Sequence, residues 1–326
     1  MNSRLLKSAA ALAILSLAAA LAALIWVYRS GHSQLIGNLV FAETAAEEAQ
    51  IKEIIIRTPE QSITLVPDNN FWHIKEADYY YANFDIVRSL FKNFQESRFT
   101  GKQTATPQLI TDFALANPYK ETANAGISIS IIGSNGHEYN HVIIGKKNSD
   151  DITRYMRIPS LPDIFTVSGQ FALPDNLASW LQQPLLSLEA KDLQALKVGD
   201  IAVSRKEPIQ PFIVFANKHP VRLAKLDQLQ RQIVYLNFDS VISAQNFDDT
   251  RYPNRRNLQF TTFAGLVYQL NLFSDNQEYW LKLTLSTTAL PTTETNDYIK
   301  NNAFLYDGWF FKLPESTGRV LYQYQL

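Results

Sequence analysis

Short segments in which hydrophobic and polar residues alternate recur along the chain after residue 50. This period of two is typical of β-strands that bury one face. In the first half the segments are 52–58, 61–66, 71–75, 127–131, 139–144, 154–158 and 164–167. Proline, glycine and asparagine separate them, notably at 67–70 and 133–136, which predicts an antiparallel meander and a hairpin.

Between these strands the hydrophobic period changes to that of a helix. The residues spaced at i, i+3, i+4 and i+7 are Val87, Leu90, Phe91 and Phe94. Asn83 or Asp85 can cap this helix, which we expect to cover the sheet. Thr106 before Pro107 predicts a second, short helix, and a third is expected around 177–181.

The second half of the chain repeats this order more loosely. Strands are expected near 200–204, 211–216 and 221–223, then a helix at 226–236, a hairpin of 258–263 and 266–273, and a strand at 279–285. The closest local match pairs 155–159 with 310–314, about 155 residues apart, each followed within about six residues by another apolar strand. The Thr- and Pro-rich stretch 287–295 is expected to be a loop. The predicted fold class is therefore α+β: two related units of antiparallel sheet with packed helices, residues 51–190 and 191–326.

A third pattern occupies the N-terminus, where residues 9–27 carry no charged side chain. At 1.5 Å per residue this run can cross a hydrocarbon core of about 30 Å. Arg4 and Lys7 precede it, which favours a cytoplasmic N-terminus and an extracytoplasmic body. We therefore expect residues 1–30 to form a cytoplasmic tip and a transmembrane helix in the inner membrane, and residues 31–50 a juxtamembrane linker. The alternative is a signal peptide cleaved among the small residues at 18–22, which would export the body equally.

Charge and cysteine content exclude several classes of function. Thirty basic and 31 acidic side chains leave a formal net charge of −1, so the chain has no overall positive field to attract nucleic acid. It contains no cysteine, which excludes disulfides, thiolate catalysis and cysteine-ligated zinc. No nucleic-acid partner and no cofactor are therefore expected.

One segment matches the zinc-hydrolase pattern H-E-x-x-H, with His137, Glu138 and His141 as the residues of interest. The pattern works on a helix, where i and i+4 lie one turn apart on the same face. Here a Gly136 turn precedes it and a β-branched run follows, which predicts a strand with its two histidines about 13 Å apart. A metal site is therefore not expected, and a zinc hydrolase is kept as an alternative function.

Two further groups of residues are candidate partner surfaces. The tyrosines Tyr79, Tyr80 and Tyr81 could stack on sugars, and this glycan-binding alternative predicts exposed rings. The cluster Arg251, Tyr252, Arg255 and Arg256 could pair with carboxylates or phosphates. The acidic pairs at 150–151 and 248–249 lie between expected strands, where turn formation is the simpler role.

The order of several short motifs resembles the family called domain of unknown function 4340. The segments are 71–74 (Phe-Trp-His-Ile), 113–118 (Phe-Ala-Leu-Ala-Asn-Pro), 143–147 (Ile-Ile-Gly-Lys-Lys), 154–157 (Arg-Tyr-Met-Arg) and 165–167 (Phe-Thr-Val). Ala114 stands where the family usually has glycine. The resemblance covers residues 51–187 well and the second half by pattern only. It implies a membrane-anchored extracytoplasmic module that accompanies ABC-transporter components of the gliding-motility type, with no established catalytic residues.

Together these observations favour a non-catalytic accessory or binding module with a membrane-protein or envelope partner. No catalytic constellation supports an enzyme, because the chain has neither G-x-S-x-G nor a glycine-rich phosphate loop.

Overall fold

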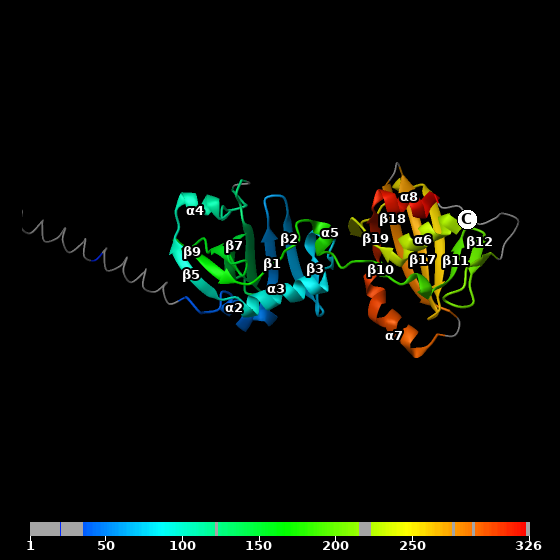
Figure 1. Ribbon diagram of the computed structural model, residues 1–326, viewed down its shortest axis with the longest axis horizontal. Coiled ribbons are helices and arrows are strands. Elements are labelled where there is room, and N and C mark those ends of the chain that lie inside the picture. The colour runs from blue at the N-terminus through cyan, green and yellow to red at the C-terminus, as the bar shows by residue number, and fades with distance from the viewer. Residues whose placement is uncertain are drawn as a thin grey trace, which may run out of the picture. The chain divides into compact units, whose positions relative to one another are not determined.

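The computed structural model describes residue 20 and residues 35–120, 123–214, 223–275, 278–288 and 291–323 (Figure 1). The expected membrane segment 9–27 lies outside this part of the chain except for Ala20. Within the described residues, no helix has both the length and the apolar character needed to cross a bilayer.

The structure is α+β, with two large antiparallel sheets and few helices, as the hydrophobic pattern predicts. The first sheet has the strand order β4-β3-β2-β1-β6-β7-β8-β9-β5. Its strands are β1 (Ile51–Arg57), β2 (Ser62–Asp68), β3 (Phe71–Ile74), β4 (Tyr80–Tyr81), β5 (Phe99–Thr104), β6 (Ile127–Gly133), β7 (Glu138–Lys147), β8 (Thr153–Arg157) and β9 (Asp163–Ser168).

The second sheet has the order β13-β12-β11-β16-β17-β18-β19-β15. Its strands are β11 (Leu193–Val198), β12 (Ile201–Ser204), β13 (Ile213–Val214), β15 (Ser240–Ser243), β16 (Asn254–Thr262), β17 (Leu266–Asp275), β18 (Glu278–Thr287) and β19 (Trp309–Leu313). A separate pair joins β10 (Leu186–Ser187) to β14 (Tyr235–Leu236).

The helices are α2 (Ala42–Ala46), α3 (Phe84–Glu96), α4 (Pro107–Asp112), α5 (Leu177–Trp180), α6 (Leu223–Val234), α7 (Thr293–Asn302) and α8 (Glu315–Gln323). The two longest of these are α3, which follows β4, and α6, which follows β13. Asn83 caps α3, because its Oδ1 accepts hydrogen bonds from the N–H groups of Asp85 and Ile86. Thr106 caps α4 with proline at the first turn, as predicted.

The two sheets share one topology. The first sheet contains the order β1-β6-β7-β8-β9-β5, and the second contains the equivalent order β11-β16-β17-β18-β19-β15. The sequential neighbours β2 and β3 correspond in the same way to β12 and β13, and α3 to α6. This shared strand order is what a duplicated unit would produce, and the duplication itself stays a prediction. The predicted local match is wrong by one strand, because 155–159 lies in β8 whereas 310–314 lies in β19, whose equivalent is β9.

Two sequence expectations in the second half are also corrected. The apolar stretch after residue 314 is helix α8 and not a strand, and the expected loop 287–295 ends in the first turn of α7. The strand expected at 221–223 lies outside the described residues except for Leu223, which begins α6.

The chain forms two compact units. The first comprises the described residues of Met1–Ser62 with Arg88–Ala172, and the second comprises Ile63–Val87 with Leu173–Leu326. The predicted domain limits, 51–190 and 191–326, enclose strands β1–β9 and β11–β19 respectively and stay a prediction.

In the first unit, part of the predicted linker is packed. Phe41 is fully buried, with ring centroids 4.7 Å from Phe94 and 6.0 Å from Phe171. In the second unit, α8 contacts α6 and β18 on one face of the second sheet (Figure 1). Buried residues such as Leu270, Leu281 and Phe311 form the core of that sheet.

Candidate functional site

The histidine motif lies at the start of strand β7, as the sequence predicts. His137 Nε2 is 3.2 Å from Glu43 Oε1, and His141 Nε2 is 3.2 Å from Ser128 Oγ. Glu138 and His141 line a cavity of about 250 Å³, of which His137 is not a lining residue. The one-turn helical geometry that the zinc alternative requires is not present here. Within the described residues, no group of three His, Asp or Glu side chains could hold a metal ion.

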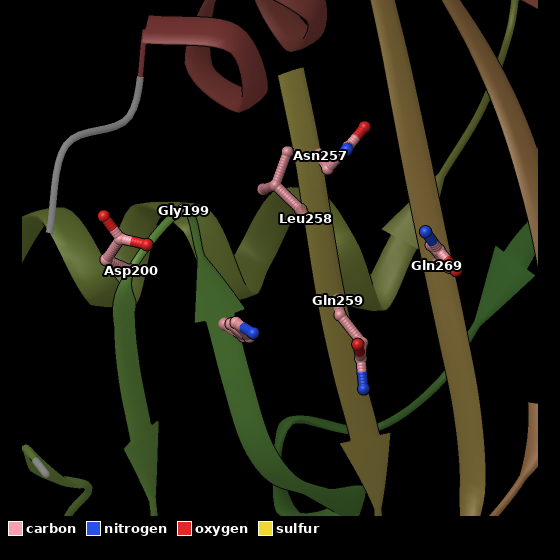
Figure 2. Close-up of a pocket in the computed structure, with 7 residues that line it drawn as sticks. Gly199, Asp200, Asn257, Leu258, Gln259 and Gln269 are labelled. Carbon is pink, nitrogen blue, oxygen red and sulfur yellow. The ribbon is translucent and has the colours of Figure 1, made fainter.

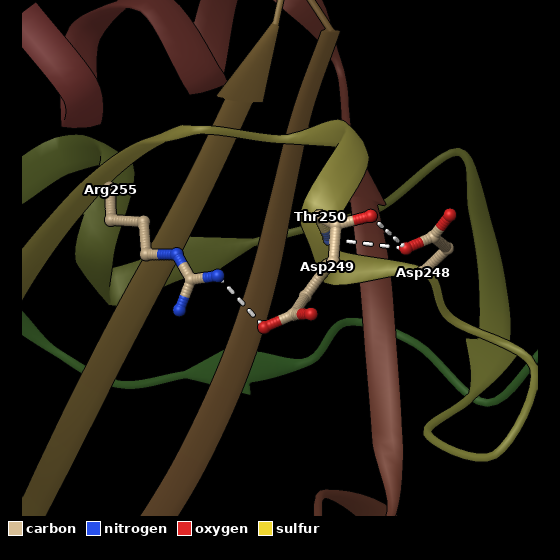
Figure 3. Close-up of polar contacts among 4 residues, drawn as sticks. All are labelled: Asp248, Asp249, Thr250 and Arg255. Atoms are coloured by element: carbon tan, nitrogen blue, oxygen red, sulfur yellow. Dashed lines mark hydrogen bonds and ion pairs between the residues drawn. The ribbon is translucent and has the colours of Figure 1, made fainter.

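The two acidic pairs form turns, which confirms the simpler interpretation. Asp150 Oδ1 accepts hydrogen bonds from the N–H groups of Ile152 and Thr153, and Asp150 Oδ2 from the Thr153 hydroxyl. The backbone N–H of Thr153, followed by its hydroxyl, lowers the pKa of Asp150. Asp248 accepts from the hydroxyl and the N–H of Thr250 (Figure 3), and these bonds lower its pKa in the same way.

The arginine cluster does not form a single surface. Arg255 Nη2 is 2.8 Å from Asp249 Oδ2, and its guanidinium lies 5.2 Å from the Phe273 ring centroid (Figure 3). Arg256, the next residue, donates from Nη1 to the Tyr322 carbonyl at 2.6 Å, and burial lowers the pKa of its guanidinium. Because successive strand residues point to opposite faces, these two arginines separate.

Tyr252, the aromatic member of that cluster, is buried and donates to Glu278 Oε2 at 3.2 Å. Arg251 is exposed. Of the four predicted residues, the exposed ones are therefore Arg251 and Arg255.

A polar cavity of about 310 Å³ lies on the second sheet (Figure 2). Lys197, Gln259 and Gln269 are cross-strand neighbours on β11, β16 and β17, and they alternate with buried residues such as Phe260. The other lining residues are Gly199, Asp200, Asn257 and Leu258. These groups offer hydrogen bonds from amides and one ammonium, so the cavity is suited to weak polar contact.

The three consecutive tyrosines have three different environments. Tyr79 is 50% exposed, Tyr80 is fully buried and Tyr81 is half-buried. The Tyr80 hydroxyl donates to the Leu305 carbonyl at 3.2 Å, and its ring lies edge-on to those of Trp309 and Phe311. Burial raises the pKa of Tyr80 well above its usual value. Tyr80 is thus a core residue that supports the strand on which Tyr81 lies.

Tyr79 and Tyr81 line a groove of about 720 Å³ within the second unit. This volume falls in the range of about 300–1,000 Å³ that is typical of ligand sites. Its lining residues are Asp78, Tyr79, Tyr81, Ser243, Ala244, Gln245, Asn246, Phe304, Asp307, Gly308 and Trp309. We define this set as the aromatic groove, because four of its side chains are aromatic rings.

The backbone at the edge of the groove is strained and held in place. Asp78 and Tyr79 both adopt left-handed conformations, with φ of 52° and 64°. Such residues cost free energy and persist where surrounding contacts fix them. The Tyr79 N–H donates to the Ile74 carbonyl at 2.9 Å, and His73 Nδ1 lies 2.7 Å from the Tyr79 carbonyl oxygen.

The Asp78 carboxylate fixes a second segment of the groove. Its Oδ2 accepts hydrogen bonds from the Ser243 N–H at 3.1 Å and from Asn246 Nδ2 at 2.9 Å. Both bonds use one carboxylate oxygen, so Oδ1 keeps its capacity as an acceptor. Asp78 therefore orders the 243–246 segment while it remains available to a bound molecule.

The remaining rings belong to an extended aromatic network. Phe304 lies 4.8 Å from Tyr81 and 4.9 Å from Phe71, and Trp309 lies 5.1 Å from Tyr80, measured between ring centroids. Contacts of this kind restrict ring motion and preserve the shape of the groove. Sequence analysis identified Tyr79 and Tyr81 as candidates but missed Phe304, Asp307 and Trp309, whose segments carry no motif.

Comparison with known proteins agrees with this architecture. The family model for a domain of unknown function, DUF4340, matches residues 72–274, which is more than half of the chain. The chain belongs to the DUF4340 family. The family match begins later than the expected resemblance over 51–187 and extends much further into the second half. It includes the 78–81 and 243–246 segments of the groove, whereas Phe304, Asp307 and Trp309 lie beyond it.

The structure gives a reason why glycine would suit position 114. Ala114 adopts φ of 52°, the left-handed conformation that glycine adopts at low cost. No curated protein and no solved structure matches the chain significantly.

Proposed function

We propose that this DUF4340 protein is a non-catalytic binding module, held at the inner membrane by residues 9–27 with its body outside the cytoplasm. The aromatic groove is the observation that carries the proposal. It combines an exposed tyrosine, a fixed backbone and polar groups at its edge, which are the features of a preformed recognition site. The partner that we expect is a component of the envelope, such as an ABC-type transporter complex.

The zinc-hydrolase alternative has less support. His137 and His141 contact different partners, Glu43 and Ser128, and their strand geometry does not converge on one metal position. Zinc content of the purified chain and of a His137→Ala variant tests the alternative directly. Stoichiometric zinc that the variant loses would contradict the non-catalytic proposal.

The membrane part of the proposal rests on the uncharged run at 9–27 and on Arg4 and Lys7 before it. Protease added to intact spheroplasts should digest the body, and alkaline carbonate should leave the chain in the membrane pellet. A variant with Leu15→Asp and Leu17→Asp should pass into the supernatant. Protection of the body from external protease would refute the predicted orientation.

The groove is tested by a photocrosslinking amino acid placed at position 79 of the full chain in its native membrane. Tyr235 supplies a matched control position, because it is a surface tyrosine of the same unit with 57% exposure. We expect a discrete adduct from position 79 and none of that size from position 235. The same adducts from both positions, or none from position 79, would contradict a partner at the groove.

A further inference from the structure

We infer that the aromatic groove binds a neutral carbohydrate chain. This inference rests on the proposed binding function and deepens it by naming the ligand class. Four properties of the groove support it: its rings, its polar groups, its charge and its position in the fold.

The rings supply the apolar half of a sugar site. A pyranose presents a face of C–H groups, which packs on an aromatic face while the ring edges remain available for polar contacts. Tyr79 exposes half of its surface, and Tyr81 and Trp309 are partly exposed in the same groove. Neighbouring rings hold Tyr81 and Trp309 in place, so little side-chain entropy is lost when a ligand binds.

The polar groups supply the other half. Asp78 Oδ1 and Asp307 are acceptors for sugar hydroxyls, and the side chains of Gln245 and Asn246 both donate and accept. Each of these planar carboxylate and amide groups presents two polar atoms side by side, which suits hydroxyl groups on neighbouring carbons of a sugar. Because Gln245, Asn246 and Asp307 are exposed, the groove is open along its edge and can admit one segment of a longer chain.

The charge of the groove selects a neutral ligand. Among its described lining residues are two carboxylates and no lysine or arginine. Phosphates, nucleotides and acidic glycans would meet repulsion there without a compensating cation. A quaternary ammonium ion would also suit rings and carboxylates, and the experiment below separates it from a sugar.

Part of the groove lies where the described parts of the two sheets differ. Strand β4 has no counterpart among the described strands of the second sheet. The segment that contains Phe304 and Asp307 follows α7, which is inserted between β18 and β19, whereas β8 and β9 are joined by a short turn. The segments that form the groove therefore lie outside the strands that the two sheets share, where loop residues can form a site without changing the shared strand order.

The test is binding of cellohexaose, chitohexaose and maltohexaose to the full chain, measured one at a time by saturation-transfer NMR and calorimetry. The chain is kept in a polyoxyethylene detergent, because a maltoside would itself offer a sugar. We expect saturable binding of at least one oligosaccharide. A Tyr79→Asn variant should weaken it about tenfold or more, since asparagine tolerates the left-handed backbone but removes the ring.

Three further variants keep the result interpretable. Tyr235→Ala, the control at an exposed tyrosine outside the groove, should bind within about threefold of the parent. Tyr79→Phe retains the ring and should bind more tightly than Tyr79→Asn. Asp307→Asn removes a negative charge but retains an acceptor, so it should weaken sugar binding less than Tyr79→Asn does. Thermal melting of each variant establishes that the fold is intact.

Each other outcome overturns the inference in a distinct way. Binding of tetramethylammonium that Asp307→Asn abolishes, without sugar binding, would identify a cation site. Absence of sugar binding together with a protein adduct from position 79 would reject the carbohydrate and leave the binding function standing. Absence of both would reject the two together, and cleavage of the oligosaccharide would replace the binding module with a glycosidase.

Discussion

Replacement of Gly318 by alanine tests the packing of α8 on the second sheet. In an exposed helix this change would stabilise the chain, because alanine has the better helix propensity by about 0.5–1 kcal/mol. Gly318, however, is buried, and a Cβ placed on it would lie closer than 3.0 Å to the Cβ, Cγ and Cδ2 atoms of Tyr279 on β18. Cβ of Tyr279 is bonded to the backbone and Cγ is bonded to Cβ, so rotation of a flexible side-chain end cannot relieve the overlap.

The magnitude follows from the two opposing contributions. Overpacking of a well-packed core costs about 1–3 kcal/mol. Here α8 would have to shift as a whole, and the hydrogen bond from the Thr317 hydroxyl to Gln232 of α6 opposes that shift. Subtraction of the gain in helix propensity leaves a net loss of about 0.5–2 kcal/mol in the free energy of unfolding. For a domain of this size the melting temperature should fall by about 2–4 °C per kcal/mol.

Urea unfolding followed by tryptophan fluorescence measures this change, with Ser316→Ala as the control in the same helix. Ser316 is exposed, so its replacement should leave stability unchanged or raise it by a few tenths of a kcal/mol. If Gly318→Ala stabilises the chain as much as Ser316→Ala does, α8 does not pack on Tyr279 as the structure has it.

Three further predictions address backbone strain and titration. Ala114→Gly should raise the free energy of unfolding by up to about 1 kcal/mol in thermal melting, because Ala114 has φ of 52°; Ala114→Val should lower it. Burial raises the pKa of Tyr80, so the unfolded phenol ionises first and stability falls above about pH 10. Tyr80→Phe should reduce that alkaline slope in urea unfolding, and an unchanged slope would contradict the burial of this ring. A hydrogen bond from Lys312 lowers the pKa of Glu278, so this pair stabilises the fold above the usual carboxyl pKa and loses its effect as pH falls through the lowered value. Lys312→Met should therefore destabilise the chain less in acid than at pH 7, and an equal loss at both would contradict the pairing.

Elements with a strong local period were predictable from the sequence. The helix α3 and its cap at Asn83, the proline-initiated α4 and the β6–β7 hairpin all appear where the pattern places them. In each case the same residues determine both the period and the start of the element. Local sequence and tertiary packing agree there, so no long-range information is needed.

Elements that depend on distant contacts were not predictable. Residues 315–323 include apolar side chains that suit a strand, but they form helix α8, which packs on β18 with Gly318 close against Tyr279. The match of β8 with β19 failed for a related reason. Neighbouring antiparallel strands have similar patterns of buried residues, so composition does not distinguish one from the next, and hydrogen-bonded order does.

The candidate site shows the same division. The tyrosine triplet was visible in the sequence, but its separation into an exposed Tyr79, a buried Tyr80 and a half-buried Tyr81 follows from two consecutive left-handed residues. The polar 243–246 segment has no motif, and Asp78 brings it to the groove through hydrogen bonds across about 165 residues of sequence.

The strand order that the two sheets share gives a physical reason why the groove lies apart from the histidine motif. A strand order present in both sheets must satisfy the same core, which limits the changes that β6–β9 and β16–β19 can accept. The histidine motif begins in β7, one of these shared strands, and its side chains are engaged in packing and surface contacts. Helix α7 is inserted between β18 and β19, whereas a short turn joins β8 to β9, so the residues of this insertion lie outside the shared strands. Recognition residues are therefore expected outside the shared strands, and Asp78, Tyr79 and Asp307 lie there.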